Sequence, residues 1–202
     1  MGLLSYLTVF LAATGSALAA PAAESPADIA VPTPKITSIT YSGNGCVRDP
    51  KLSGSFNDPT FTYQGFTLSL PTNTTANCQI HIQASGAGPG WQVALKSSQV
   101  KGRLVLTPGT SLTHYTTVFF SQNPTKTSTV SGTVSNDSRN TISRSVTLVS
   151  KADSSELAWS PCTGSDGYTG IMNVNFRGVL SGNSRAYFEA QTETWELQWR
   201  RC

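Results

Sequence analysis

Hydrophobic and polar residues alternate along most of this chain. In the segment Cys-Gln-Ile-His-Ile-Gln at 78–83, the apolar residues fall on one face of an extended strand and the polar residues on the other. The same alternation recurs at 91–95, 100–106, 146–148, 172–176 and 195–199. Sustained helical periodicity is absent, so the pattern predicts half-buried β-strands.

Clusters of glycine, proline, asparagine and serine separate these segments, at 42–45, 86–90, 164–170 and 181–183. Residues 61–63 and 66–70 change register across Gly65, which predicts a bulge or a tight turn. Segment 125–141 is dense in Ser and Thr and poor in apolar residues, so we expect a long exposed connection or an edge hairpin there.

Short strands with polar outer faces and frequent turn signals are typical of antiparallel sheets. We therefore predict an all-β fold, an antiparallel β-sandwich of jelly-roll-like form, with a closed barrel as the alternative. No internal repeat in the sequence indicates a solenoid or a propeller.

The N-terminal residues have the pattern of an export signal. Residues 1–19 contain an apolar run that ends in Ala-Leu-Ala, as in a cleaved signal peptide, and the run is shorter than the roughly 20 residues of a membrane-spanning helix. Residues 20–34 are rich in Ala and Pro, which predicts a flexible leader. No second apolar stretch follows. We expect one folded domain at 35–202, secreted and without a membrane span.

Four cysteines fit an oxidising compartment. Cys46, Cys78, Cys162 and Cys202 are even in number, and no close C-x-x-C pair indicates a zinc site. Three pairings are open. We favour Cys46–Cys78 with Cys162–Cys202, because each bridge then closes a local loop, whereas the other pairings would cross-link the two halves of the domain. Two N-glycosylation sequons, at Asn73 and Asn136, lie in polar, turn-like stretches.

The charge pattern argues against a nucleic-acid partner. The chain has a formal net charge of +3, and its basic residues are dispersed, with Arg200-Arg201 as the only adjacent pair. A nucleic-acid surface normally shows a basic stripe interleaved with aromatics. The positive balance suits a location near anionic cell-wall polymers.

A catalytic motif is not recognisable in the sequence. His81 lies on the polar face of its predicted strand, where a solvent-facing or cross-strand role explains it, and His114 has no acidic neighbour. There is no G-x-S-x-G elbow and no spacing of metal ligands, so we expect neither a metal nor a cofactor.

A carboxylate pair is the sharpest enzymatic hypothesis. Glu189 and Glu193 share a face with Trp195 and Trp199 if 187–199 is one unbroken strand, which would resemble the groove of a glycoside hydrolase. Residues four apart on one face are about 13 Å apart at their Cα atoms, wider than such a pair requires. A hairpin tip at 191–192 would also separate them.

The tryptophans have a structural interpretation and a functional one. Trp159, Trp195 and Trp199 are explained by packing in a small core, and Trp159 is expected to pack against a disulfide. Trp91 begins a strand after a Gly/Pro-rich turn and is the one we expect to be partly exposed. It is the candidate glycan contact.

Several strings taken together resemble a known family. They are Ile-Thr-Ser-Ile-Thr-Tyr-Ser-Gly-Asn-Gly-Cys at 36–46, Asn-Cys-Gln-Ile at 77–80, Pro-Gly-Trp at 89–91, Leu-Ala-Trp-Ser-Pro-Cys at 157–162 and Leu-Gln-Trp-Arg-Arg-Cys at 197–202. This ordered set resembles the secreted fungal proteins grouped as domain of unknown function 4360. The resemblance implies a secreted, cysteine-bridged, β-rich protein and supplies no catalytic residues.

The sequence therefore predicts a secreted non-enzymatic protein. We expect it to act through its surface, at the cell wall or on an extracellular or host partner, with a polysaccharide or a protein as the ligand. The alternative is a glycan-active enzyme that uses the carboxylate pair. The sequence does not indicate an oligomeric state.

Overall fold

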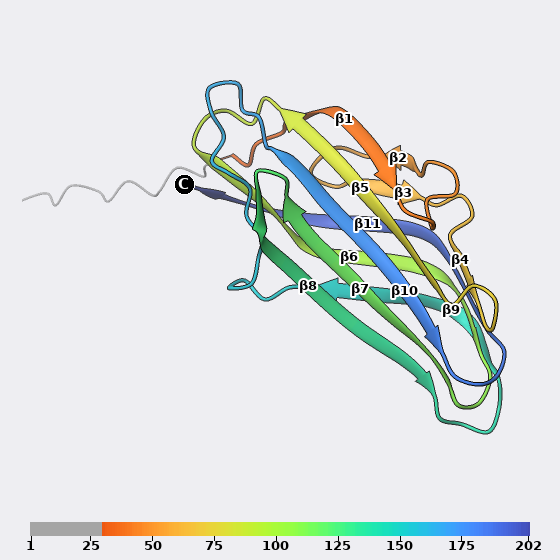
Figure 1. The fold of residues 1–202 in the computed structure, drawn as a ribbon. Coiled ribbons are helices and arrows are strands. Elements are labelled where there is room, and N and C mark those ends of the chain that lie inside the picture. Colours follow the sequence, from red (N-terminus) through yellow and green to blue (C-terminus); the bar gives the residue numbers. More distant parts are fainter. Residues whose placement is uncertain (1–29) are drawn as a thin grey trace, which may run out of the picture. The chain divides into compact units, whose positions relative to one another are not determined.

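The computed structural model describes residues 30–202 and consists of two antiparallel sheets packed face to face (Figure 1). The predicted signal peptide and most of the predicted leader lie outside the described residues. The first sheet has five strands, in the order β1 (Lys35–Ser42), β5 (Thr75–Ser85), β10 (Ile171–Ser181), β7 (Thr110–Phe120) and β8 (Asn123–Asn136).

The second sheet is built around two 16-residue strands. Its order is β2 (Lys51–Ser53), β3 (Thr60–Thr62), β11 (Ala186–Arg201), β6 (Trp91–Leu106) and β9 (Ile142–Lys151), and β4 (Thr67–Ser69) also pairs with β11. The predicted all-β sandwich is confirmed. Segment 125–141 falls mostly within β8, which is the edge strand of the first sheet and pairs with β7 along its length.

The core lies between the two sheets and follows from the alternation in the sequence. Every second residue of β5 and β7 is buried, while the residues between them are half-buried on the outer face. Burial of large apolar side chains is the main favourable contribution to folding. The fully buried ones include Phe56, Phe61, Phe66, Phe120, Phe176 and Phe188.

Both predicted disulfides are confirmed. Cys46–Cys78 joins the loop after β1 to β5, and Cys162–Cys202 joins the long segment between β9 and β10 to the end of the chain. At Gly65 the backbone has a φ of +103°, a conformation that glycine adopts readily, and the chain turns there between β3 and β4. The predicted turn is therefore present.

The packed unit begins before Lys35. It spans Val31–Cys202, with Pro32 and Pro34 buried. The carbonyl oxygen of Pro32 accepts a hydrogen bond of 2.7 Å from the side-chain amide of Asn57. The last residues of the predicted leader thus pack on the domain. Among residues 30–202, no helix is long and apolar enough to cross a membrane.

Candidate binding surface

The structure separates the two carboxylates of the enzymatic hypothesis. Between Ala190 and Thr192 the pairing of β11 with β6 shifts by one residue, which leaves Gln191 as a β-bulge. The bulge reverses which face the following residues occupy. Glu189 is half-buried on the outer face of the second sheet, whereas Glu193 points into the core and is 1% exposed. The expectation that they share a face is therefore wrong.

Glu193 is held entirely by neutral donors. It accepts hydrogen bonds from the Tyr63 hydroxyl, from Ser98 Oγ at 2.7 Å and from Trp195 Nε1 at 2.8 Å. Burial raises the pKa of Glu193, and these three hydrogen bonds oppose that shift only in part. Burial and the neighbouring carboxylate raise the pKa of Tyr63 well above its ordinary value. A carboxylate enclosed in this way is not accessible to a substrate.

The histidines take different positions. His114 is 4% exposed, with its Nδ1 3.4 Å from Ser150 Oγ, and burial lowers its pKa. His81 lies on the outer face of the first sheet, directly opposite Asn173 on β10, and its Nδ1 is 2.5 Å from Asn173 Oδ1. Its other ring nitrogen is 3.0 Å from Ser42 Oγ. The predicted cross-strand role of His81 is therefore confirmed.

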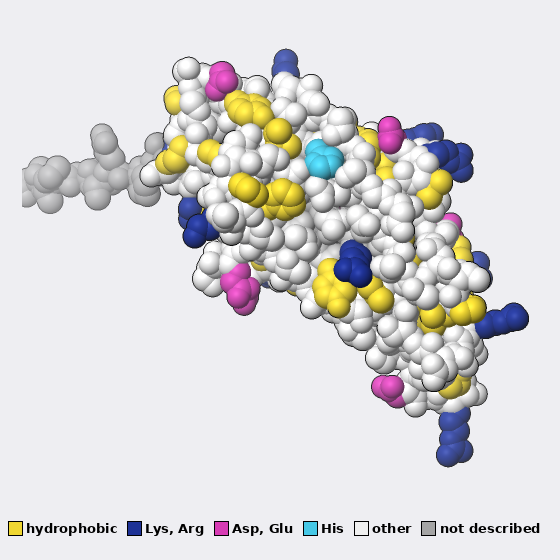
Figure 2. All heavy atoms as spheres, viewed as in Figure 1, with side chains coloured by type: hydrophobic (Ala, Val, Ile, Leu, Met, Phe, Trp, Pro, Cys, Tyr) yellow, Lys and Arg dark blue, Asp and Glu magenta, His cyan; other side chains and the backbone are white. Residues whose placement is uncertain are grey.

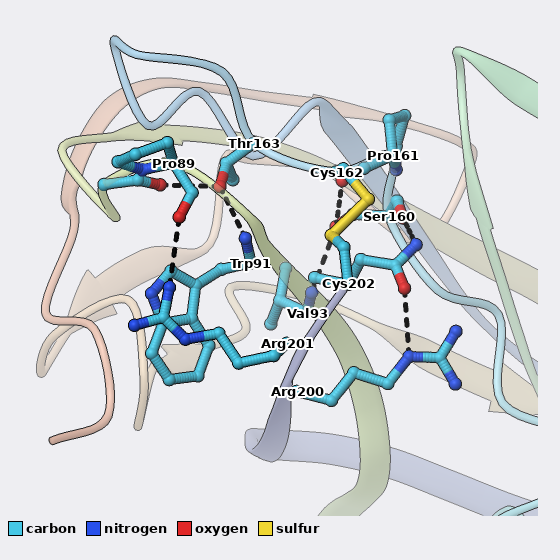
Figure 3. The surroundings of a disulfide bond; sticks show 12 residues. Pro89, Trp91, Val93, Ser160, Pro161, Cys162, Thr163, Arg200, Arg201 and Cys202 are labelled. Atoms are coloured by element: carbon cyan, nitrogen blue, oxygen red, sulfur yellow. Dashed lines mark hydrogen bonds between the residues drawn. A yellow bond between two sulfur atoms is a disulfide. The ribbon is translucent and has the colours of Figure 1, made fainter. Parts of the chain in front are cut away.

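Trp91 does not occupy the exposed position expected for it. It is 8% exposed, and the guanidinium of Arg201 lies 4.0 Å from the centre of its ring (Figure 3). Trp195 is in the core and Trp199 is partly buried against it. Trp159 is half-buried, with Arg200 stacked 4.0 Å above its ring. The Trp91 ring therefore offers little surface to a glycan.

The two sequon asparagines differ in accessibility. Asn73 is exposed in the turn after β4. Asn136 is 0% exposed, and its side-chain amide donates to the carbonyl oxygens of Leu106 and Asn140 at 2.8 and 2.9 Å. A glycan on the Asn136 nitrogen would break these two hydrogen bonds and displace the atoms that bury it. The side-chain amide of Asn73 also donates a hydrogen bond, of 2.7 Å to Thr67 O, but its residue is exposed. Glycosylation stays a prediction, and the structure favours Asn73 over Asn136 as the accessible acceptor in the folded protein.

The outer face of the first sheet carries a lattice of neutral polar side chains, and we call the outward side chains of β5, β10 and β7 the amide face. Antiparallel pairing aligns these side chains in rows across the strands. One row contains His81, Asn173 and Phe119, and the next contains Gln79, Asn175 and Thr117.

Hydrogen bonds to neighbouring strands and to adjoining loops fix many of these side chains. Asn77 donates to Asn175 Oδ1 at 3.2 Å, and the Tyr168 hydroxyl donates to Gln83 Oε1 at 3.0 Å. Asn173, which is 2% exposed, donates to Ser121 Oγ at 2.9 Å. The lattice is thus held in one arrangement before any ligand arrives.

The amide face is nearly free of charge. Its outward positions include no acidic residue, and Arg177 is their one lysine or arginine. Figure 2 views the domain from this side and shows acidic side chains only toward the margins, around a largely neutral centre. The outer face of the second sheet differs, because it carries Lys101, Arg103 and Glu189.

Two aromatic residues stand on the amide face. Phe119 and Tyr115 are half-buried outward residues of β7, with Thr117 between them. Their Cα atoms are about 13 Å apart for a strand rise of roughly 3.3 Å per residue. The guanidinium carbon of Arg177 lies 6.0 Å from the centre of the Tyr115 ring. Sequence reasoning missed this face, because its members come from strands whose pairing is not visible in the chain order.

Comparison with known proteins identifies a family. The model of the domain of unknown function DUF4360 matches residues 32–202. The chain belongs to the DUF4360 family. The family expected from the sequence is thus confirmed, while secretion and a fungal origin stay predictions. Among curated proteins, none matches this chain.

A search of solved structures finds a similarity to TmCBM61 in complex with beta-1,4-galactotriose. The sequence identity is 11% and the TM-score is 0.25, over 83% of this chain and 91% of that chain. At this level the similarity carries no argument about the function of the DUF4360 chain.

Proposed function

We propose that this DUF4360 protein is a non-enzymatic extracellular protein that binds a polysaccharide along its amide face. A neutral glycan presents hydroxyl groups and ring oxygens, which donate and accept hydrogen bonds without charge. Asn, Gln, Ser and Thr side chains offer the same two roles. The observation that carries the proposal is the uncharged lattice of such side chains on one sheet, beside a charged outer face on the other.

The fixed arrangement of the lattice supports this function. Binding costs less when the side chains of the site lose little rotamer freedom on contact with the ligand. His81 and Asn175, which are half-buried, already form hydrogen bonds to side chains of the neighbouring strand. An extended chain of sugars would therefore meet donors and acceptors in set positions.

The aromatic residues supply the apolar part of such a site. The faces of sugar rings expose C–H groups, which pack against aromatic rings. Phe119 and Tyr115 lie in line along β7, so a chain that follows this strand meets both rings.

The two disulfides favour an extracellular location, because disulfides persist in oxidising compartments. The cell wall or a host surface would supply the polysaccharide. The enzymatic alternative is less favoured, because Glu189 and Glu193 occupy opposite faces of β11 and Glu193 is buried. An extracellular protein partner is the other possibility, and retention on insoluble polysaccharides distinguishes the two.

Retention on insoluble polysaccharides tests the proposal. The purified protein is mixed with chitin, β-glucan and cellulose, and the bound fraction is measured after washing, together with released reducing sugars. We expect retention on at least one polymer without release of sugar. Phe119→Ala should weaken that binding about five- to tenfold, the size expected for the loss of one aromatic contact.

Tyr187→Ala is the matched control, because Tyr187 is a half-buried aromatic on the outer face of the second sheet. It should bind as the wild type does. Equal binding by Phe119→Ala and the wild type would contradict the proposed face. Absence of retention on all three polymers would instead favour a protein partner.

A further inference from the structure

A pocket of about 440 Å³ is lined by Ser160 and Pro161, which directly precede Cys162 of the Cys162–Cys202 disulfide. Its walls include Trp159, Arg200, Gln92, Gln122, Asn123 and Lys126. A second pocket of about 400 Å³ shares Lys126 with it and is lined by Glu156. We call the first one the Trp159 pocket.

The disulfide and a set of backbone bonds hold two walls of the Trp159 pocket together. Trp159 precedes Cys162 by three residues and Arg200 precedes Cys202 by two. Ser160 N donates to Val93 O at 2.9 Å, and Val93 N donates to Ser160 Oγ at 3.0 Å (Figure 3). The segment with Trp159 is thus fastened to the start of β6, next to the end of β11.

Arg200 is fixed with its terminal nitrogens left for a ligand. Its guanidinium stacks 4.0 Å above Trp159, and its Nε donates to Gln92 Oε1 at 2.9 Å. Gln92 is anchored in turn, because its Nε2 donates to the carbonyl oxygen of Ser160 at 2.6 Å. Figure 3 shows the two terminal nitrogens of Arg200 on the side away from the Nε hydrogen bond.

The other polar walls of the pocket also present donors. Gln122 uses its carbonyl oxygen to accept from Ile171 N at 3.0 Å, which leaves its NH₂ group to donate. Asn123 Oδ1 accepts from Thr125 Oγ1 at 2.9 Å, which leaves the second NH₂ group. Lys126 adds an ammonium group.

An internal carboxylate does not neutralise these cations. The salt bridge found among residues 30–202 joins Lys96 to Glu196. Neither Arg200 nor Lys126 therefore forms a salt bridge within that range. The Trp159 pocket itself is lined by no Asp or Glu, since Glu156 lines its neighbour. The pocket therefore presents four donor groups, two of them cationic, and the guanidinium has the planar geometry that pairs with a carboxylate.

We propose that the Trp159 pocket binds a carboxylate group of an acidic polysaccharide. The inference rests on the proposed glycan-binding function, because Gln122 and Asn123 of the pocket directly follow β7, whose outward side chains belong to the amide face. The walls formed by Gln92 and Arg200 come from β6 and β11 of the second sheet. Gln122 holds the first residue of β10, Ile171, and Asn123 pairs with Phe120, the neighbour of Phe119. In this proposal, a sugar chain that lies along β7 and β10 and continues past the turn at 121–122 places a uronate residue in the pocket.

Isothermal titration of the purified full-length protein tests this inference with laminarin, a soluble β-glucan, in three forms. The polymer is used untreated, after oxidation of its primary alcohols to carboxylates, and after methyl esterification of those carboxylates. We expect the carboxylate form to bind at least about tenfold more tightly than the other two, the usual value of a charge-assisted hydrogen-bonded pair. This preference should decrease as the salt concentration rises.

The variants Arg200→Gln and Lys126→Gln should each remove most of the preference while keeping the melting temperature close to that of the wild type. Arg103→Gln is the matched control, because Arg103 is an exposed cation on the outer face of the second sheet. It should keep the full preference.

Equal affinity for the carboxylate and ester forms would overturn the inference, and so would a preference that survives Arg200→Gln. In both cases the effect of Phe119→Ala on the binding of untreated glycan tests the proposed function of the amide face independently. Equally tight, Arg200-dependent binding of poly-glutamate would overturn the assignment to a saccharide.

Discussion

The buried carboxylate of Glu193 makes the stability of the domain depend on pH in a defined direction. No lysine or arginine bonds to it among residues 30–202, and burial raises the pKa of this carboxyl group. Below its ordinary value of about 4.3, Glu193 is protonated in both the folded and the unfolded chain. Its contribution to stability is then complete. As the pH rises above that value, the unfolded chain releases the proton first, so the free energy of unfolding decreases.

The loss continues up to the pKa of Glu193 in the folded protein. Its slope reaches at most about 1.4 kcal/mol per pH unit for one proton. Glu193→Gln keeps the size of the side chain and its acceptor for Ser98 and Trp195, and Tyr63 can accept from the new NH₂ group. Because the charge is gone, we expect this variant to match the wild type near pH 4 and to be more stable than it at pH 7.

Urea denaturation at pH 4–8, with the disulfides intact, measures this difference. His114 titrates with the opposite sign, because burial lowers its pKa and its protonation favours unfolding. Both proteins contain His114, so its contribution cancels in the comparison. Glu189→Gln retains Glu193 and should show the same loss as the wild type. A wild-type protein that becomes more stable relative to Glu193→Gln between pH 4 and 7 would refute the reasoning.

Three further predictions concern stability and modification. Replacing Cys162 and Cys202 by Ser removes a disulfide that joins residues 40 apart in sequence. Urea denaturation should show a decrease of about 3.9 kcal/mol in the free energy of unfolding by the chain-entropy relation, and an unchanged denaturation midpoint would contradict this expectation. Mass spectrometry of the protein from a glycosylating secretory host should find a glycan at Asn73 and none at Asn136, and a glycan at Asn136 in folded protein would be inconsistent with its burial. Gly102→Ala places a methyl group 2.2 Å from the carbonyl oxygen of Glu189. The variant should lower the free energy of unfolding by about 1–3 kcal/mol, as overpacking does. An unchanged free energy of unfolding would show that β6 and β11 can separate there.

Local pattern predicted the strands and the bridges of this domain. Alternation is a property of neighbouring residues, so 78–83 and 172–176 fall within β5 and β10 as expected. The cysteine pairs that close local loops are the ones that form. The edge position of β8 also agrees with its low content of apolar residues.

Features that depend on packing between distant segments were not predictable in this way. The bulge at Gln191 is a matter of register between β11 and β6, and it moves Glu193 into the core. Trp91 is buried instead of partly exposed, because Arg201 covers its ring. Asn136 is buried because its amide bonds to Leu106 O, a contact 30 residues away.

The amide face was missed for the same reason. His81, Asn173 and Phe119 come from three strands, and only the strand order β5, β10, β7 places them side by side. In sequence each looks like an ordinary polar or apolar residue on the solvent side of a strand. The signal was the scarcity of charge at every second position of these strands, which becomes informative once the strands are known to be neighbours.

A titration of isotope-labelled protein with a soluble oligosaccharide of the retained polymer, followed by NMR of the backbone amides, tests directly whether the amide face binds the glycan. We expect the largest shift changes in β5, β10 and β7, around Asn173, Thr117 and Phe119. The outer positions of β6 and β11, including Lys101 and Glu189, should be unaffected. Shift changes confined to the second sheet, with β5, β10 and β7 unchanged at saturation, would contradict this expectation.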